Sequence, residues 1–327
     1  MVDFLKGKLT SNSLRLVFPE GENLKILKVA SKLNQKGMCK VILLGEKSKI
    51  LDAAKDNNLS LEGIEIIDPL RDSNLDFKAD ILYEIRKGKN TREECLKMLK
   101  SSNYYGVMMV KMGLADALLG GVTYSTADIV RPALQIIRAK ERTKTVSSSF
   151  LMIKDNNKMI MSDCAIVVNP TSDQLTEITI ASVDTARLFD IEPSVALLSY
   201  STHGSGRGVE VDKVKEAVRM LEDKQVDFNF DGELQFDTAM SKEVRDKKSP
   251  GSRLLNDANV LIFPNLESGN IGYKIAARLG GYKAIGPILQ GLGAPINDLS
   301  RGSSEEEIYL LSLISLLQAQ NNSLLFE

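Results

Sequence analysis

The first part of the chain alternates short apolar runs with amphipathic segments. Apolar runs predict strands at residues 14–18, 40–44 and 64–67. Residues 24–33 and 50–55, between them, carry apolar side chains at helical spacing. This alternation predicts a parallel sheet covered by helices. Because ligands bind beyond the carboxyl ends of such strands, we expect functional residues in the loops that follow them.

A glycine- and hydroxyl-rich turn follows the strand predicted at residues 115–119. Residues 120–128 have the sequence GGVTYSTAD, which favours a phosphate cradle at the start of a helix. The helix is expected over residues 128–137. Because a proline is tolerated only in the first turn of a helix, Pro132 predicts that Arg131 lies near the helix start and this turn.

The topology is expected to change before the middle of the chain. Apolar runs at residues 146–153 and 159–168, joined by a polar turn, predict the first antiparallel strand pair. We therefore expect an α/β protein with mainly parallel sheets and two domains. Domain I comprises residues 1–143 plus 290–327, and domain II comprises residues 144–289.

Composition excludes several classes of protein. The chain has 327 residues and a net charge of −1, which argues against a nucleic-acid-binding surface. No apolar run reaches about 18 residues and no signal-peptide pattern is present, so we expect a cytoplasmic protein. The cysteines Cys39, Cys95 and Cys164 are scattered, which suggests neither a disulfide framework nor a metal site.

Standard nucleotide motifs and standard nucleophile motifs are missing. Neither a GxGxxG fingerprint nor a GxxxxGK[ST] loop occurs, which argues against dinucleotide enzymes and P-loop NTPases. His203 is the only histidine, and it lies in a glycine-rich segment without a nucleophile-elbow pattern. We interpret it as a loop residue.

The stretch at residues 286–307 offers an anion site. Ser300 and Arg301 lie in a polar turn before the last apolar segment, which predicts a helix whose N-terminus favours anions. An arginine fork matches a pair of phosphate oxygens. Glu307 is either a carboxylate that serves the chemistry or one half of a capping box with Ser304, and the sequence leaves both open.

Short motifs along nearly the whole chain carry a family resemblance. They are FPE at 18–20, GVTYSTAD at 121–128, RPA at 131–133, SYST at 199–202, GS at 204–205, DGELQ at 231–235, FPNL at 263–266, GNI at 269–271, YK at 273–274, GP at 286–287 and RG at 301–302. In this order they resemble the short-form phosphate acetyltransferases (phosphotransacetylases).

The resemblance implies a reaction and an architecture. The reaction is acetyl-CoA + phosphate ⇌ CoA + acetyl phosphate, by direct attack with both substrates bound. The architecture is two three-layer αβα domains with the active-site cleft between them, in a homodimer. CoA and acetyl-CoA are substrates, no cofactor or metal is bound, and neither nucleic acid nor a membrane is a partner.

Three residues match the family's catalytic positions. Arg301 is expected to bind the phosphoryl oxygens and to stabilise charge on the carbonyl oxygen. Ser300 is expected to orient the reacting groups. Glu307 stands where the family has an aspartate that takes the thiol proton, and its side chain is one methylene longer. Ser303 stands where the family often has a cysteine.

Further residues match the family's binding positions. For CoA these are Arg86 and Arg131, and for phosphate or acetyl phosphate they are Ser125, Thr126, Tyr273 and Lys274.

Two other functions stay open. A phosphate butyryltransferase would have the same fold and a longer acyl pocket. A catalytically idle homologue would bind CoA or phosphate without turnover, and the identity of position 307 separates it from an enzyme. A relative of isocitrate dehydrogenase is disfavoured, because no aspartate cluster suited to its metal is recognisable.

Overall fold

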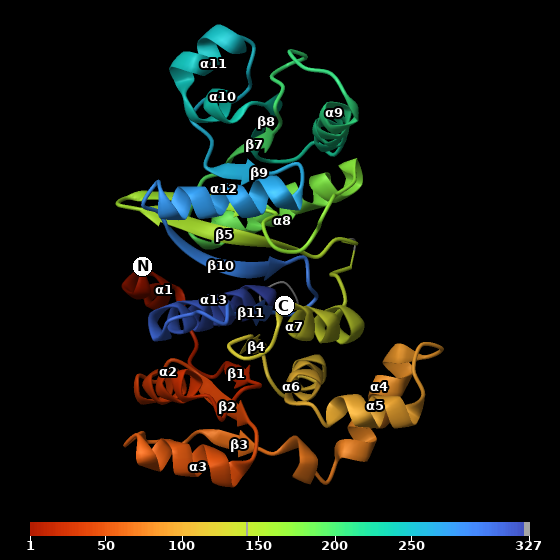
Figure 1. Ribbon diagram of the computed structural model, residues 1–327, viewed down its shortest axis with the longest axis vertical. Coiled ribbons are helices and arrows are strands. Elements are labelled where there is room, and N and C mark those ends of the chain that lie inside the picture. The colour runs from red at the N-terminus through yellow and green to blue at the C-terminus, as the bar shows by residue number, and fades with distance from the viewer. Residues whose placement is uncertain (142, 324–327) are drawn as a thin grey trace. The chain divides into compact units, whose positions relative to one another are not determined.

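The computed structural model describes residues 1–141 and 143–323. The chain divides into two compact units, Met1–Lys140 with Leu292–Glu327 (unit 1) and Glu141–Gly291 (unit 2). The boundaries predicted from the sequence lie a few residues from these. Figure 1 shows the elements of both units.

Unit 1 is built on a five-stranded sheet in which all neighbouring strands are parallel. The strand order is β11-β4-β1-β2-β3. One group of helices comprises α1, α2, α3 and α13, and a second comprises α4 to α7 with the π-helical turn η2. The elements are α1 (Val2–Lys8), β1 (Arg15–Phe18), α2 (Leu24–Gln35), β2 (Lys40–Leu44), α3 (Lys47–Asp56), β3 (Glu65–Ile67), η1 (Pro69–Arg71), α4 (Leu75–Arg86), α5 (Arg92–Leu99), α6 (Ser102–Lys111), β4 (Ala117–Gly120), α7 (Thr126–Pro132), η2 (Ala133–Ile137), β11 (Ile296–Asp298) and α13 (Glu305–Ser323).

Close helix-to-sheet packing sets the position of α6. Gly106 faces the sheet, and a Cβ at this position would lie 2.8 Å from Leu118 Cδ1 and 3.3 Å from Leu44 Cδ1. The missing side chain therefore lets the helix backbone approach the strands, as expected in a densely packed interior.

Unit 2 is built on a six-stranded mixed sheet. The strand order is β10-β5-β6-β9-β7-β8, and β6, β9, β7 and β8 are parallel to one another. The antiparallel pairing predicted for residues 146–153 and 159–168 is confirmed in β5 and β6. The outer strand β10 also pairs antiparallel with β5. The elements are β5 (Ser147–Lys154), β6 (Asn157–Ser162), α8 (Ser172–Leu188), β7 (Ser194–Leu198), α9 (Val209–Asp223), β8 (Asn229–Leu234), α10 (Phe236–Met240), α11 (Lys242–Lys248), β9 (Val260–Ile262), α12 (Leu266–Arg278) and β10 (Lys283–Gln290).

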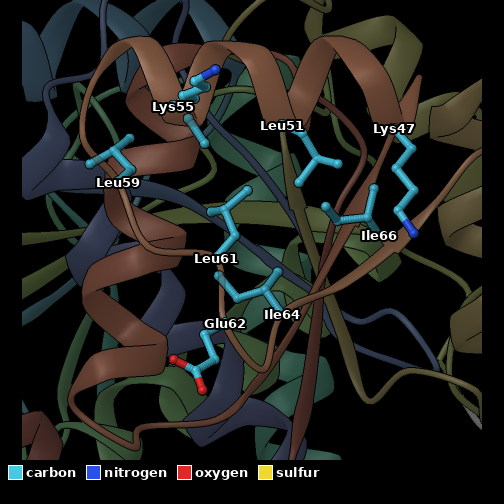
Figure 2. A pocket seen from close by; sticks show the side chains of 9 residues that line it. Lys47, Leu51, Lys55, Leu59, Leu61, Glu62, Ile64 and Ile66 are labelled. Carbon is cyan, nitrogen blue, oxygen red and sulfur yellow. The ribbon is translucent and has the colours of Figure 1, made fainter.

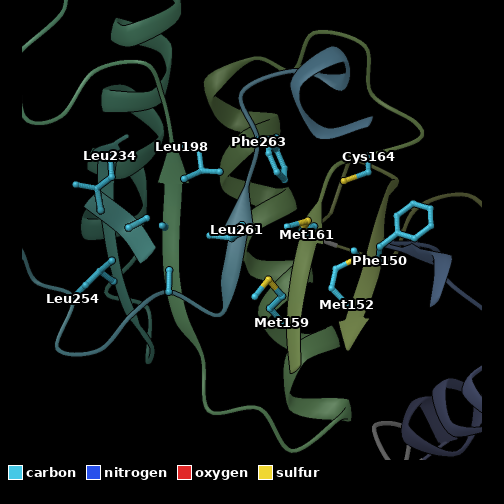
Figure 3. Packing of buried hydrophobic residues seen from close by; sticks show 13 residues of the cluster. Phe150, Met152, Met159, Met161, Cys164, Leu198, Leu234, Leu254, Leu261 and Phe263 are labelled. Carbon is cyan, nitrogen blue, oxygen red and sulfur yellow. The ribbon is translucent and has the colours of Figure 1, made fainter. Parts of the chain in front are cut away.

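The apolar core of unit 2 follows the two-residue period of the strands. Met152 and Phe150 on β5 lie beside Met159 and Met161 on β6, with Leu261 on β9 next in the sheet (Figure 3). Alternate side chains of a strand point to the same face, so these residues form one apolar surface. Tyr273, Ala276 and Ala277 of α12 pack against this cluster. The helices α8 and α9 contact each other and the strands of this sheet, and form a helical group separate from α12. The predicted α/β class with helix-flanked, mainly parallel sheets is thus confirmed.

Three elements of the structure differ from what the sequence pattern indicates. The helix expected over 128–137 begins two residues earlier, at Thr126, and the α-helix ends at Pro132, where a π-helical turn follows. Proline lacks the N–H of a regular helical hydrogen bond, which explains the change of helix type. Arg131 therefore lies in the last turn of α7, so its expected place at the helix start is wrong.

The other two differences concern polar residues. The polar segment 265–270 carries no apolar helical pattern, but the helix α12 begins within it, because the Asn265 side chain caps the helix by accepting a hydrogen bond from Ser268 N at 2.9 Å. The strand β11 was not predicted, because two of its three residues, Asn297 and Asp298, are polar. None of the helices in the described part of the chain is long and apolar enough to cross a membrane.

Candidate active site

The order of strands in unit 1 gathers the candidate loops at the carboxyl ends of neighbouring strands of its sheet. The chain passes from β1 to β2 and β3 on one side, whereas β4 and β11 lie on the other. Such a reversal at the carboxyl ends of parallel strands is the usual ligand position in open α/β sheets. Glu20 follows β1, the 121–125 turn follows β4, and Ser300 and Arg301 follow β11.

The backbone of the 121–125 turn binds a carboxylate of the protein itself. Glu20 is 7% exposed, and its Oε2 accepts hydrogen bonds from Gly121 N at 2.7 Å and Val122 N at 3.1 Å. Its Oε1 accepts from Tyr124 N at 3.0 Å and from the backbone and hydroxyl of Thr123. The N–H groups that suggested a phosphate cradle are therefore turned toward Glu20, which holds the turn in shape.

The hydroxyls of Ser125 and Thr126 also have partners within the chain. Ser125 caps α7 in a capping box with Asp128, and its Oγ lies 2.6 Å from Asp128 Oδ2. Thr126 Oγ1 donates to Asp298 Oδ2 at 2.7 Å. Any contact of these hydroxyls with phosphate would thus compete with, or add to, an existing hydrogen bond.

Asp298 is a buried carboxyl group at the end of β11. It is 1% exposed, and its Oδ1 has no hydrogen-bond partner among the described residues. Burial, reinforced by the charge of Glu20, raises the pKa of Asp298 from 3.8 to about 6, against the hydrogen bond from Thr126. No role was predicted for Glu20 or Asp298. The available signal for Glu20 was its place two residues after the apolar run at 14–18, in a loop expected to carry functional residues, whereas Asp298 ends a strand that was not predicted.

Ser300 and Arg301 lie in the exposed turn that follows Asp298. Gly302 N donates to Ser300 Oγ at 3.3 Å, and Ser303 N donates to Ser300 O at 2.9 Å, which closes the turn. Arg301 makes no hydrogen bond or ion pair with any residue that the structure describes. Its guanidinium is therefore available to an anion from solution.

Glu307 takes part in a capping box at the start of α13. Its Oε2 accepts from Ser304 N at 2.7 Å and from Ser304 Oγ at 3.0 Å, and Glu307 N donates to Ser304 Oγ at 3.2 Å. The helix-cap alternative is therefore realised in this structure. A carboxylate that caps with one oxygen still has the other for a proton transfer.

The charges of the two arginines expected to bind CoA act on a common side chain, Tyr104. Burial raises the pKa of Tyr104, while the nearby charges of Arg131 and Arg86 lower it. Arg86, the last residue of α4, donates from Nε to Asn90 Oδ1 at 2.9 Å. Arg131 is exposed on α7. The hydrogen bonds of Ser125 lower the pKa of Asp128, and the charge of Arg131 lowers it further. Both arginines therefore lie close enough to this phenol for their charges to influence its pKa.

Tyr273 and Lys274 belong to unit 2, whereas the other predicted site residues belong to unit 1. The Tyr273 ring stacks on Phe150 with centroids 4.0 Å apart, and Lys274 Nζ donates to Asn270 Oδ1 at 2.6 Å. The stacking places Tyr273 of α12 against Phe150 of β5, whereas the hydrogen bond of Lys274 lies within α12. Their role in phosphate binding stays a prediction.

His203 has partners that resemble a hydrolase triad. Its Nε2 lies 3.1 Å from Asp231 Oδ1 and its Nδ1 lies 2.7 Å from Ser249 Oγ. Ser249 is only 3% exposed, so a substrate cannot reach its hydroxyl. The array joins the loop after β7 to the segment after α11, which fits the interpretation of His203 as a loop residue.

An apolar groove in unit 1 contains none of the predicted site residues. It has a volume of about 450 Å³ and is lined mainly by Leu51 of α3, Leu59, Leu61, Ile64 and Ile66 (Figure 2).

Within the described residues, no group of three or more His, Cys, Asp and Glu side chains is arranged to hold a metal ion.

Comparison with known proteins identifies the family. Residues 2–316 match the family model described as phosphate acetyl/butaryl transferase. The chain is 47% identical over 315 residues to a phosphate acetyltransferase from Bacillus subtilis, covering 96% of this chain and 98% of that protein.

Two solved structures extend the likeness to the fold. A phosphotransacetylase from Streptococcus pyogenes superposes with a TM-score of 0.95 at 44% identity, covering 98% of both chains. A phosphotransacetylase from Staphylococcus aureus superposes with a TM-score of 0.90 at 44% identity, covering 97% of this chain and 98% of that one. The chain therefore belongs to the phosphate acetyl/butaryl transferase family.

Proposed function

We propose that this chain is a phosphate acetyltransferase, which interconverts acetyl-CoA and phosphate with CoA and acetyl phosphate. The observation that carries the proposal is the exposed Ser300–Arg301 turn at the carboxyl end of β11, in a chain of this family. A guanidinium with no partner in the described part of the chain is suited to a doubly charged phosphoryl group.

The proposed chemistry is direct transfer between the two substrates. The CoA sulfur attacks the carbonyl carbon of acetyl phosphate, a C–S bond forms, and the C–O bond to phosphate breaks. Arg301 binds the phosphoryl oxygens and stabilises the negative charge on the carbonyl oxygen, and Ser300 orients the reacting groups. A free thiol has a pKa near about 8.5, so the thiol proton must leave.

Glu307 is the proposed acceptor of that proton. Its Oε2 is committed to the Ser304 cap, so the reaction would use Oε1. The cap fixes the carboxylate at a defined place, which general-base catalysis requires.

Arg86 and Arg131 are the proposed CoA-binding residues. The proposed phosphate-binding residues are Ser125, Thr126, Tyr273 and Lys274. That the two units enclose the substrates stays a prediction.

The activity is tested by following CoA consumption with acetyl phosphate. We expect Arg301→Gln to lower kcat by about 100-fold or more, because a donor to the developing negative charge is lost. Arg301→Lys keeps the charge without the fork and should lie between the two. Arg219→Gln, on the surface of α9 and paired with Glu216, is the matched control and should retain full activity. A wild type with no turnover would refute the proposal.

The acyl group is tested in the same assay. The family model covers acetyl and butyryl transferases, so butyryl phosphate is the competing substrate. A kcat/KM that is higher for acetyl phosphate supports the proposal, and the reverse order indicates the butyryl enzyme.

We also propose that the protein is a homodimer. Ile271 and Ile275 of α12 and Leu279, the C-cap residue of this helix, follow one another at intervals of four and are 57%, 52% and 84% exposed. Residues four apart lie on one face of a helix, so these side chains form an apolar stripe. A stripe of this kind favours burial against a second copy.

A further inference from the structure

One hydrogen bond joins the two turns that carry the proposed anion-binding groups. Thr126 is the first residue of α7 and directly follows the 121–125 turn. Asp298 is the last residue of β11 and stands two residues before Ser300. The bond from Thr126 Oγ1 to Asp298 Oδ2 measures 2.7 Å. It therefore connects segments that are 172 residues apart in the sequence.

The backbone around Asp298 is fixed, whereas its side chain depends on Thr126. Asp298 pairs with Gly120 in the sheet, and Leu299 N donates to Gly120 O at 2.6 Å. A Cβ at Gly121 would clash with Asp298 Oδ1, so the carboxyl group lies directly against the 121–125 turn. Oδ1 has no hydrogen-bond partner within residues 1–141 and 143–323. Thr126 is thus the side chain that orients this carboxyl group.

The arrangement is costly for stability alone. A buried carboxyl group with one donor, close to the charge of Glu20, is unfavourable compared with an apolar residue of similar size. Native structures keep such groups where they serve the function of a neighbouring site. The neighbouring site here is the turn with Ser300 and Arg301.

We propose that Thr126 and Asp298 are positioning residues for acyl transfer. Their hydrogen bond holds the 299–302 turn against the 121–125 turn, so that Ser300 and Arg301 meet the phosphoryl group in one fixed orientation. The inference rests on the proposed function, and it assigns to Thr126 a role through Asp298 that differs from direct contact with phosphate.

A double-mutant cycle separates these two roles of Thr126. Thr126→Val removes the hydroxyl and keeps the shape, Thr126→Ser keeps the hydroxyl, and Asp298→Ala removes the acceptor. We expect Thr126→Val to lower kcat with acetyl phosphate about 10- to 100-fold and Thr126→Ser to stay within about threefold of wild type, given the strength of a hydrogen bond to a charged group. The double variant should be no slower than the slower single variant. Effects that multiply would overturn the proposal, because Thr126 would then act independently of Asp298.

A readout that needs no turnover keeps the test independent of the proposed function. Hydrogen–deuterium exchange of peptides spanning residues 299–304 should be faster in Thr126→Val than in wild type and unchanged in Thr126→Ser. Thr179→Val is the matched control, since it removes a buried hydroxyl that donates only within α8, to Leu175 O at 2.7 Å. It should leave both kcat and this exchange unchanged. Unchanged exchange in Thr126→Val would refute the link even if the wild type is active, and an inactive wild type would refute only the proposed function.

Discussion

At the scale of single residues, Asp298 makes a measurable contribution to the pH dependence of stability. Its pKa rises from 3.8 to about 6 on folding, because the carboxyl group is buried near Glu20. The folded protein therefore binds this proton more tightly than the unfolded chain, and stability falls as the pH rises from about 4 to about 6. Two pKa units correspond to about 3 kcal/mol. We expect Asp298→Asn, which stays neutral and can still accept from Thr126, to lack this loss.

The measurement is the difference in thermal stability between Asp298→Asn and wild type across the pH range. Between about pH 4 and pH 7, the free energy of unfolding of the variant should rise relative to that of the wild type by up to about 3 kcal/mol. Carboxylates with lowered pKa values, such as Asp72 and Asp128, change stability in the opposite direction at lower pH, but they do so equally in both proteins. A difference that does not change with pH would show that Asp298 is ionised as easily in the folded protein as in the unfolded chain.

At the candidate site, the sequence indicates which residues are exposed better than which polar residues are buried. Ser300 and Arg301 could be proposed from the sequence because they lie in a polar turn before a helix, where local pattern has a direct structural meaning, and the structure has both in an exposed turn before α13. Glu20 and Asp298 were missed because nothing in a polar residue's neighbours shows that it is buried. Their burial follows from the adjacency of β1, β4 and β11, which are far apart along the chain.

At the scale of elements, the start of α13 combines a helix cap with the proposed base. Ser304 and Glu307 exchange hydrogen bonds, so two variants separate the functions. Glu307→Gln keeps an acceptor oxygen for the cap and removes the base. We expect it to lose about 100-fold or more in kcat, with little change in stability.

Ser304→Ala is the complementary variant. It removes the hydroxyl that accepts from Glu307 N and keeps the carboxylate. We expect it to cost about 1 kcal/mol of stability, the usual loss for an N-cap, and to keep activity within a few-fold. Thermal denaturation and kcat are measured for both variants. If Glu307→Gln retains full kcat, Glu307 is a helix cap only.

Predicted elements were most accurate where apolar periodicity is strong. The strand predicted at 40–44 matches β2 (Lys40–Leu44), which carries four successive buried side chains. Errors occurred where polar or special residues take part in regular structure. The α12 helix begins within a polar segment, because Asn265 caps it. The turn after Pro132 stays helical by changing to π geometry, which sequence periodicity does not encode.

At the scale of the whole molecule, the proposed dimer gives the exposed stripe on α12 a function. Isolated exposed apolar residues are common, but three at intervals of four along one helix and its C-cap form a continuous surface. Ile271, Ile275 and Leu279 point away from the core cluster that Tyr273, Ala276 and Ala277 join. The helix therefore presents one apolar face to its own sheet and another to solvent, which is typical of a helix at a subunit interface.

This assignment predicts a matched pair of charge substitutions with different results. Light scattering should give the wild type about twice the 36.0-kDa mass of one chain. Leu279→Lys places a charge at the 84% exposed end of the stripe and should shift the protein toward the mass of one chain, because burying an unpaired ammonium opposes association. Leu255→Lys makes the same change at a 78% exposed leucine outside α12 and should leave the mass unchanged. If both variants keep the wild-type mass, α12 does not form the interface; a wild type with the mass of a single chain would exclude the dimer itself.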